Sequence, residues 1–143
     1  MFLAANPRLQ AVAVDTPSGT EFLRIMLLDR DGFLARIDDV GIRSDLTYGD
    51  VVRLREVGGR LHYAETVEQS DYNAYVAVAR PDDTKVAPRL AAIQGVAVRI
   101  LRTPDAAIVS VAAPPHTKDA LERELRLLVT EMRLRDLVHV VAR

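Results

Sequence analysis

The chain has 143 residues, of which 49% are hydrophobic and 27% are charged, and its formal net charge is −1 at pH 7. That size fits one domain or two very small ones, and the balanced charge lacks the basic excess of a nucleic-acid-binding protein. The chain has no cysteine, which excludes disulfide and thiol chemistry, and no apolar run long enough to span a membrane.

Composition also indicates where the protein works. Its basic residues are almost all arginine, with lysine only at Lys85 and Lys118, and alanine and valine are abundant, as in proteins from GC-rich bacterial genomes. The N-terminal residues lack the basic segment and long apolar run of a signal peptide. We therefore expect a bacterial, cytoplasmic protein with no membrane partner.

Turn-forming residues divide the first half of the chain into short segments of alternating apolar and polar residues, the pattern of half-buried β-strands. We expect five strands, at residues 11–15, 21–28, 33–40, 51–57 and 61–67. Short antiparallel strands joined by tight turns predict a small, strongly bent antiparallel sheet or a partly open barrel over residues 1–70.

The second half changes to an alternation of strands and helices. We expect four strands, at residues 73–79, 96–102, 106–112 and 137–142. A first helix is expected to begin near Asp83 or Thr84 and to end before Gly95, and a longer second helix to begin after Thr117, a typical N-cap residue. Apolar residues at helical spacing predict the buried stripe of the second helix: Leu121, Leu125, Leu128 and Met132.

The resulting order, β-α-β-β-α-β, is that of the ferredoxin-like fold. The sequence therefore predicts an α+β protein, with a β-rich subdomain at residues 1–70 and a ferredoxin-like subdomain at residues 71–143. The C-terminal strands are apolar on both faces, whereas the two helices of this topology cover only one. We expect the N-terminal strands, or a second copy of the chain in a homodimer, to cover the other face.

Three short motifs resemble a bacterial family. They are A-R-I-D-D-V at residues 35–40, Y-G-D-V-V at residues 48–52 and E-Q-S-D-Y-N-A-Y-V at residues 68–76. With the βαββαβ order downstream, they are similar to the short bacterial proteins of domain-of-unknown-function family 4265. The family's early aromatic anchor is missing here, and Asp71 and Tyr72 follow Ser70 where the family has small polar residues. The family has no established activity, so the resemblance implies a fold and no function.

Two carboxylates are the main candidates for chemistry. Asp50 follows Gly49 in front of a strand, where an aspartate usually bonds to the backbone amides of a turn; the alternative is a general acid or base. Glu65 shares a strand face with Leu61 and Val67, so it is either a buried carboxylate or, if the opposite face is the core, an ordinary exposed residue. The sequence favours the turn residue and the exposed residue.

No motif indicates a metal or cofactor site. His62, His116 and His139 form no zinc-binding pattern, and Asp38 and Asp39 lack the further oxygen ligands of a calcium or magnesium loop. The chain lacks the phosphate-binding loop, the dinucleotide-binding fingerprint and the nucleophile-elbow motif. The expected central strands carry valine, isoleucine and alanine instead of the paired aromatic residues that bind RNA. We therefore expect no cofactor, no metal and no nucleic-acid partner.

Three kinds of function fit these features. The sequence favours a non-enzymatic protein-interaction module, for example an immunity-type protein that neutralises a toxin, by analogy with small bacterial proteins. Its expected binding residues are charges on the N-terminal strands: Arg24, Asp38, Asp39, Arg53 and Arg55. The second kind is a ligand-sensing regulatory domain. The third is a small enzyme whose site would be assembled from scattered residues: Asp50, Glu65, Tyr72 and Arg99.

Overall fold

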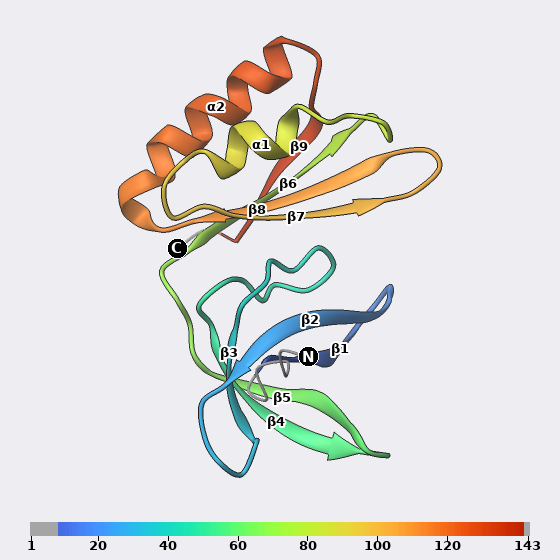
Figure 1. Ribbon diagram of the computed structural model, residues 1–143, viewed down its shortest axis with the longest axis vertical. Coiled ribbons are helices and arrows are strands. Elements are labelled where there is room, and N and C mark those ends of the chain that lie inside the picture. The colour runs from blue at the N-terminus through green and yellow to red at the C-terminus, as the bar shows by residue number, and fades with distance from the viewer. Residues whose placement is uncertain (1–8, 142–143) are drawn as a thin grey trace, which may run out of the picture. The chain divides into compact units, whose positions relative to one another are not determined.

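The computed structural model describes residues 9–141, and the chain divides into two compact units, Met1–Ser70 and Asp71–Arg143 (Figure 1). The described residues form nine β-strands in two separate sheets, together with two α-helices. The predicted α+β class is therefore confirmed. Within residues 9–141, no helix is both long enough and apolar enough to cross a membrane.

The first unit is a five-stranded barrel. Its strands follow one another around the barrel in chain order, and a parallel pairing of Ala13 with His62 joins the last strand to the first. The barrel is therefore closed, whereas the sequence predicted a bent sheet or a partly open barrel. The strands are β1 (Leu9–Thr16), β2 (Gly19–Leu27), β3 (Leu34–Ile37), β4 (Val51–Val57) and β5 (Arg60–Glu68).

Alternation along the strands builds the core of the barrel. The strand β3 is shorter than predicted, because the chain leaves it after Ile37 and enters a loop closed by a 3.0 Å hydrogen bond from Gly41 N–H to the Leu46 carbonyl oxygen. A Cβ atom at Gly41 would lie 2.5 Å from that oxygen, so only glycine permits the approach. The inward-facing residues of the strands are Val12, Val14, Leu23, Ile25, Ala35, Ile37, Val52 and Leu54.

The second unit has the predicted ferredoxin-like order. Its four strands pair antiparallel in the order β7-β8-β6-β9, and both helices lie on one face of this sheet (Figure 1). The elements are β6 (Asn73–Ala79), α1 (Val86–Ala91), β7 (Ala97–Arg102), β8 (Ala107–Ala113), a short 3₁₀ helix (Pro115–Thr117), α2 (Lys118–Thr130) and β9 (Arg135–Val141).

The helix ends follow the predictions in part. Helix α1 begins at Val86 with Lys85 at the N-cap position, so neither Asp83 nor Thr84 is the N-cap residue, contrary to the prediction. The Asp83 carboxylate nevertheless accepts hydrogen bonds from the Lys85 and Val86 N–H groups at 2.9 Å. Thr117 does occupy the N-cap position of α2, but its hydroxyl donates to the Pro114 carbonyl oxygen at 3.4 Å and caps no helix N–H. That predicted cap bond is therefore wrong.

The buried stripe of α2 is shorter than predicted. Leu121, Leu125 and Leu128 are buried in the core, as predicted. Met132 is 83% exposed, because the helix ends at Thr130 and the chain then reverses direction with Met132 at φ 58°. The assignment of Met132 to the core was wrong.

The helix-free face of this sheet retains exposed apolar surface. Residues of β6 alternate between the two faces, and Val76 pairs with Val138 on the side away from the helices. Val138 is 54% exposed. Coverage of this face by the N-terminal strands or by a second copy of the chain stays a prediction.

Candidate functional site

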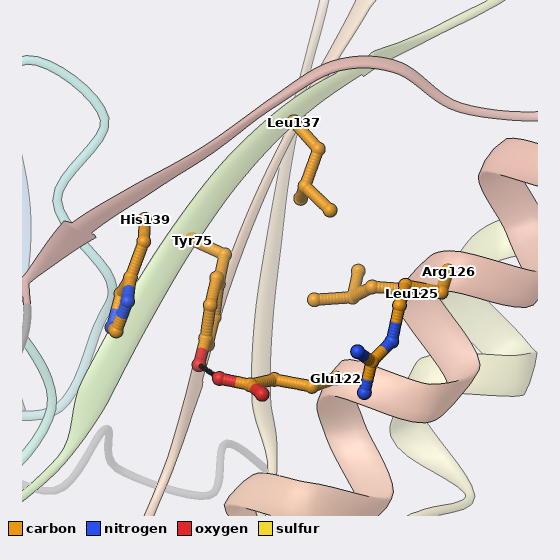
Figure 2. Close-up of a pocket in the computed structure, with 6 residues that line it drawn as sticks. All are labelled: Tyr75, Glu122, Leu125, Arg126, Leu137 and His139. Carbon is orange, nitrogen blue, oxygen red and sulfur yellow. Dashed lines mark hydrogen bonds between the residues drawn. The ribbon is translucent and has the colours of Figure 1, made fainter.

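A pocket of about 280 Å³ lies between α2 and the β6–β9 strand pair of the second unit (Figure 2). Three segments that are distant in sequence form the pocket: β6, α2 and β9. The antiparallel register of β6 and β9 sets His139 opposite Tyr75. Helix α2 covers the same face and contributes side chains from two successive turns. The lining residues are Tyr75, Glu122, Leu125, Arg126, Leu137 and His139.

A hydrogen bond between strand and helix fixes the polar end of the pocket. The Tyr75 hydroxyl donates to Glu122 Oε1 at 2.5 Å. Burial, and next the bond to this carboxylate, raise the pKa of Tyr75 well above its ordinary value. The same hydrogen bond, aided by the positive charges of Lys118 and Arg126, lowers the pKa of Glu122. At neutral pH the phenol therefore keeps its proton and the carboxylate is ionised.

The imidazole of His139 forms the opposite wall. Its ring stacks on Tyr75 with the ring centroids 4.3 Å apart and the planes inclined by 15°, and the two rings lie side by side in Figure 2. His139 Nε2 lies 3.2 Å from Asn73 Oδ1. Because an amide oxygen only accepts hydrogen bonds, Nε2 is the donor in this contact. The stacking and this bond together fix the orientation of the imidazole.

The pocket combines one carboxylate and one guanidinium with an apolar floor. Glu122 and Arg126 are one turn apart on α2, and Leu125 and Leu137 supply apolar surface from the helix and the strand (Figure 2). A phenol with a raised pKa is a poor base or nucleophile near neutral pH, which argues against Tyr75 as a reacting group. The arrangement suits noncovalent binding of a small molecule that carries both a positive and a negative group.

Asp50 lies elsewhere, in the first unit, and its surroundings support the turn interpretation. The side chain is fully buried. Its Oδ2 accepts a hydrogen bond from Thr47 N–H at 3.0 Å, and its Oδ1 accepts one from Ser70 N–H at 2.8 Å. The carboxylate therefore ties the turn before β4 to the segment after β5, and backbone donors use both of its oxygens.

Glu65 is an exposed residue of the barrel's outer wall. Its side chain is 62% exposed and pairs with Arg53 across β4 and β5 at 2.9 Å. The interpretation of Glu65 as a buried carboxylate is excluded. Arg55 is also exposed and lies opposite His62 on β5. Glu65 pairs with Arg53 and Asp50 with backbone N–H groups, so the structure does not bring the two carboxylates together.

The two aspartates proposed for partner binding are not part of an outward row of charges. Asp39 is only 5% exposed, and its carboxylate accepts hydrogen bonds from the backbone N–H groups of Arg24 and Val40 at 3.1 and 3.0 Å. Asp38 is largely covered and pairs with Arg36 at 2.8 Å. The prediction that Asp39 is a surface charge was wrong, because the barrel uses it to bond the end of β3 to β2. The outward charges that remain are the arginines.

The other candidates for an enzyme do not join the pocket. Arg99 pairs with Ser110 on β8 and lies between Val98 and Ile100, which pack against the helices, so Arg99 faces away from them. Tyr72 precedes β6 and is absent from the lining. Within residues 9–141, no three His, Asp or Glu side chains are grouped so that they could hold a metal ion.

The sequence analysis did not identify the residues that line this pocket as candidates for a functional site. One signal was present: Glu122 and Arg126 flank the buried Leu121 and Leu125 at a spacing of one helical turn, so they border the apolar stripe. Nothing local indicates that His139 lies opposite Tyr75, because that contact depends on strand pairing.

The two units define an α+β protein made of a small β-barrel and a ferredoxin-like unit. The crystal structure of a hypothetical protein from Neisseria gonorrhoeae has a similar fold, with a TM-score of 0.63 and 12% sequence identity over 96% of this chain and 97% of that chain. At this identity the likeness establishes the fold alone. No protein-family model matches the chain, and a comparison with curated proteins finds no significant match. Membership of family 4265 therefore stays a prediction.

Proposed function

We propose that the protein is a non-enzymatic, ligand-sensing regulatory protein whose second unit binds a small zwitterion between α2 and β9. The observation that carries this proposal is the Tyr75–Glu122 hydrogen bond at the mouth of a partly apolar pocket. It holds an ionised carboxylate in place for a ligand ammonium group, while Arg126, one turn along α2, is available for a ligand carboxylate. Ligand pockets typically measure about 300–1,000 Å³, so a pocket at the lower limit fits a molecule of amino-acid size.

Isothermal titration with free amino acids tests this proposal. We expect saturable binding of an amino acid, and weaker binding of the corresponding amine or carboxylic acid alone. Glu122→Gln and Arg126→Gln should each weaken binding about tenfold or more, because each removes a charge-assisted hydrogen bond. Arg123→Gln, on the same helix and outside the lining, is the matched control. The proposal fails if no amino acid binds, or if Glu122→Gln binds as the parent does.

A second candidate function is protein binding by the outer wall of the barrel. Phe22 is 46% exposed, and the Arg60 guanidinium lies over its ring at 5.3 Å from the centroid. His62 and Arg55 are cross-strand neighbours on the adjoining strands. Exposed aromatic residues and arginines are enriched at the centres of protein interfaces. A bacterial partner, such as a toxin neutralised by an immunity-type protein, is one form of this second proposal.

Reversal of the arginine charges tests the second candidate. A partner captured by the parent protein should bind the Arg53→Glu/Arg55→Glu variant more slowly and with a weaker or inverted salt dependence, since exposed charges act mainly on association rates. Arg30→Glu, in the loop after β2, is the control. Unchanged association of the folded variant would count against the outer wall as the binding surface.

A further inference from the structure

A second and larger pocket lies at the other end of α2. Its volume is about 560 Å³, and it forms where β6 ends, where α2 turns back and where β9 begins. It shares no lining residue with the Tyr75 pocket, so a ligand in it would not depend on the proposed zwitterion site. Val129 and Leu134 give it apolar surface from the helix side, and Val78 of β6 is also in its lining. We call it the arginine pocket, after Arg80, Arg133 and Arg135 in its lining.

The charges of the arginine pocket are unbalanced. Three guanidinium groups face a single carboxylate in its lining, that of Asp136, which pairs with Arg135 at 2.6 Å. Arg133 approaches Asp83 only to 3.8 Å. In the part of the chain that the structure describes, the Arg80 guanidinium has no hydrogen-bond or ion-pair partner. Among these residues the Arg80 guanidinium is therefore unpaired and that of Arg133 is held by one long ion pair with Asp83, and the planar donor sets of both match a carboxylate or a phosphate.

Two residues of the arginine pocket have a backbone conformation that is uncommon for residues other than glycine. Met132 at φ 58° and Asp136 at φ 54° are the two residues other than glycine with positive φ among residues 9–141. Both line the arginine pocket. Residues with this unfavourable backbone conformation cluster at ligand sites, where the contact they provide outweighs the strain. Asp136 also lies at an irregularity in the β6–β9 pairing, and β-bulges are frequent next to functional sites.

We propose that the arginine pocket binds an organic anion with a short apolar tail. The carboxylate or phosphate head binds Arg80 and Arg133, and the tail lies against Val129 and Leu134. Met132 is exposed and conformationally adaptable, so it closes over the tail and becomes covered when the ligand binds. Contact with the ligand tail explains why an exposed methionine occupies a backbone position where glycine would be less strained.

Titration with octanoate and octyl phosphate, below their micelle-forming concentrations, tests the proposal and separates the two head groups. At least one of the anions should bind saturably, and octylammonium, with the same tail and the opposite charge, should not. Arg80→Gln and Arg133→Gln should each weaken binding about tenfold. Arg123→Gln should leave it unchanged. Met132→Gly should weaken octanoate binding more than hexanoate binding, because only the longer tail reaches the methionine.

Two-dimensional NMR of the unmodified protein keeps the test independent of variant folding. Shift changes on adding octanoate should concentrate at residues 78–80 and 129–136. Equal binding of octylammonium, shifts centred elsewhere, or undiminished binding by a folded Arg80→Gln/Arg133→Gln variant would each overturn the proposal. Absence of binding by both anions would overturn it as well.

Discussion

Replacing Met132 by glycine is expected to stabilise the second unit, although it removes an apolar side chain. Met132 follows the C-terminal end of α2 in the left-handed conformation. The Arg133 N–H bonds to the Leu128 carbonyl oxygen at 2.9 Å, and the Met132 N–H bonds to that of Val129 at 3.0 Å. This is the hydrogen-bond pattern of a helix end whose left-handed position is usually glycine.

The magnitude depends on three opposing terms. The left-handed conformation costs a residue with a Cβ atom about 1–2 kcal/mol. Glycine removes that cost but returns about 0.5–1 kcal/mol through the greater entropy of its unfolded chain. Because Met132 is 83% exposed, its truncation loses at most about 0.5 kcal/mol of hydrophobic burial. The balance favours glycine by about 0.5 kcal/mol, or about 2–4 °C in Tm for a unit of this size.

Comparison with alanine makes the test sharper. Met132→Ala also truncates the side chain but keeps the left-handed strain, so the glycine variant should be the more stable by about 0.5–1 kcal/mol, the reverse of the usual order. Urea denaturation followed by the helical circular dichroism signal reports on the second unit, because both α-helices of the described residues lie there. An alanine variant as stable as the glycine variant would refute the reasoning.

Three further substitutions separate structural from exposed polar groups. Asp50→Asn should destabilise the first unit by about 1–3 kcal/mol in urea denaturation, because the amide leaves either the buried Thr47 N–H or the half-buried Ser70 N–H without an acceptor. Glu65→Ala should change stability by less than about 0.5 kcal/mol, since its pair with Arg53 is exposed; a larger loss would show that the pair matters. Tyr75→Phe removes the bond that lowers the pKa of Glu122. A lowered carboxyl pKa adds stability above the unfolded value of about 4.3, and this stability is lost as the pH falls through the folded-state pKa. The Tyr75→Phe variant should therefore lose stability mainly at neutral pH, and an equal loss in acid would contradict this.

The sequence predicted the bounds of an element correctly where neighbouring residues determine those bounds. Strands β4 and β6 begin and end at the predicted residues, because turn or loop residues bound each of them and their alternation is regular. The end of α2 was misjudged because Met132 keeps the helical spacing of Leu125 and Leu128, and no glycine marks the stop. Burial of Asp39 was equally hidden, since its partners lie on another strand and beside it in the backbone.

Both candidate pockets depend on β9, and their placement could not be read from the sequence for one physical reason. The β6–β9 ladder shifts register twice, between Ala74 and Tyr75 and between Val76 and Val78. Each shift changes which side chains of β9 point toward the helices, so strict alternation fails within this strand. Between the two shifts His139 is set opposite Tyr75, where it completes the zwitterion site. At the second shift Asp136 takes up its left-handed conformation beside the arginine pocket. A strand that paired regularly would offer the same residues without bringing them to these positions.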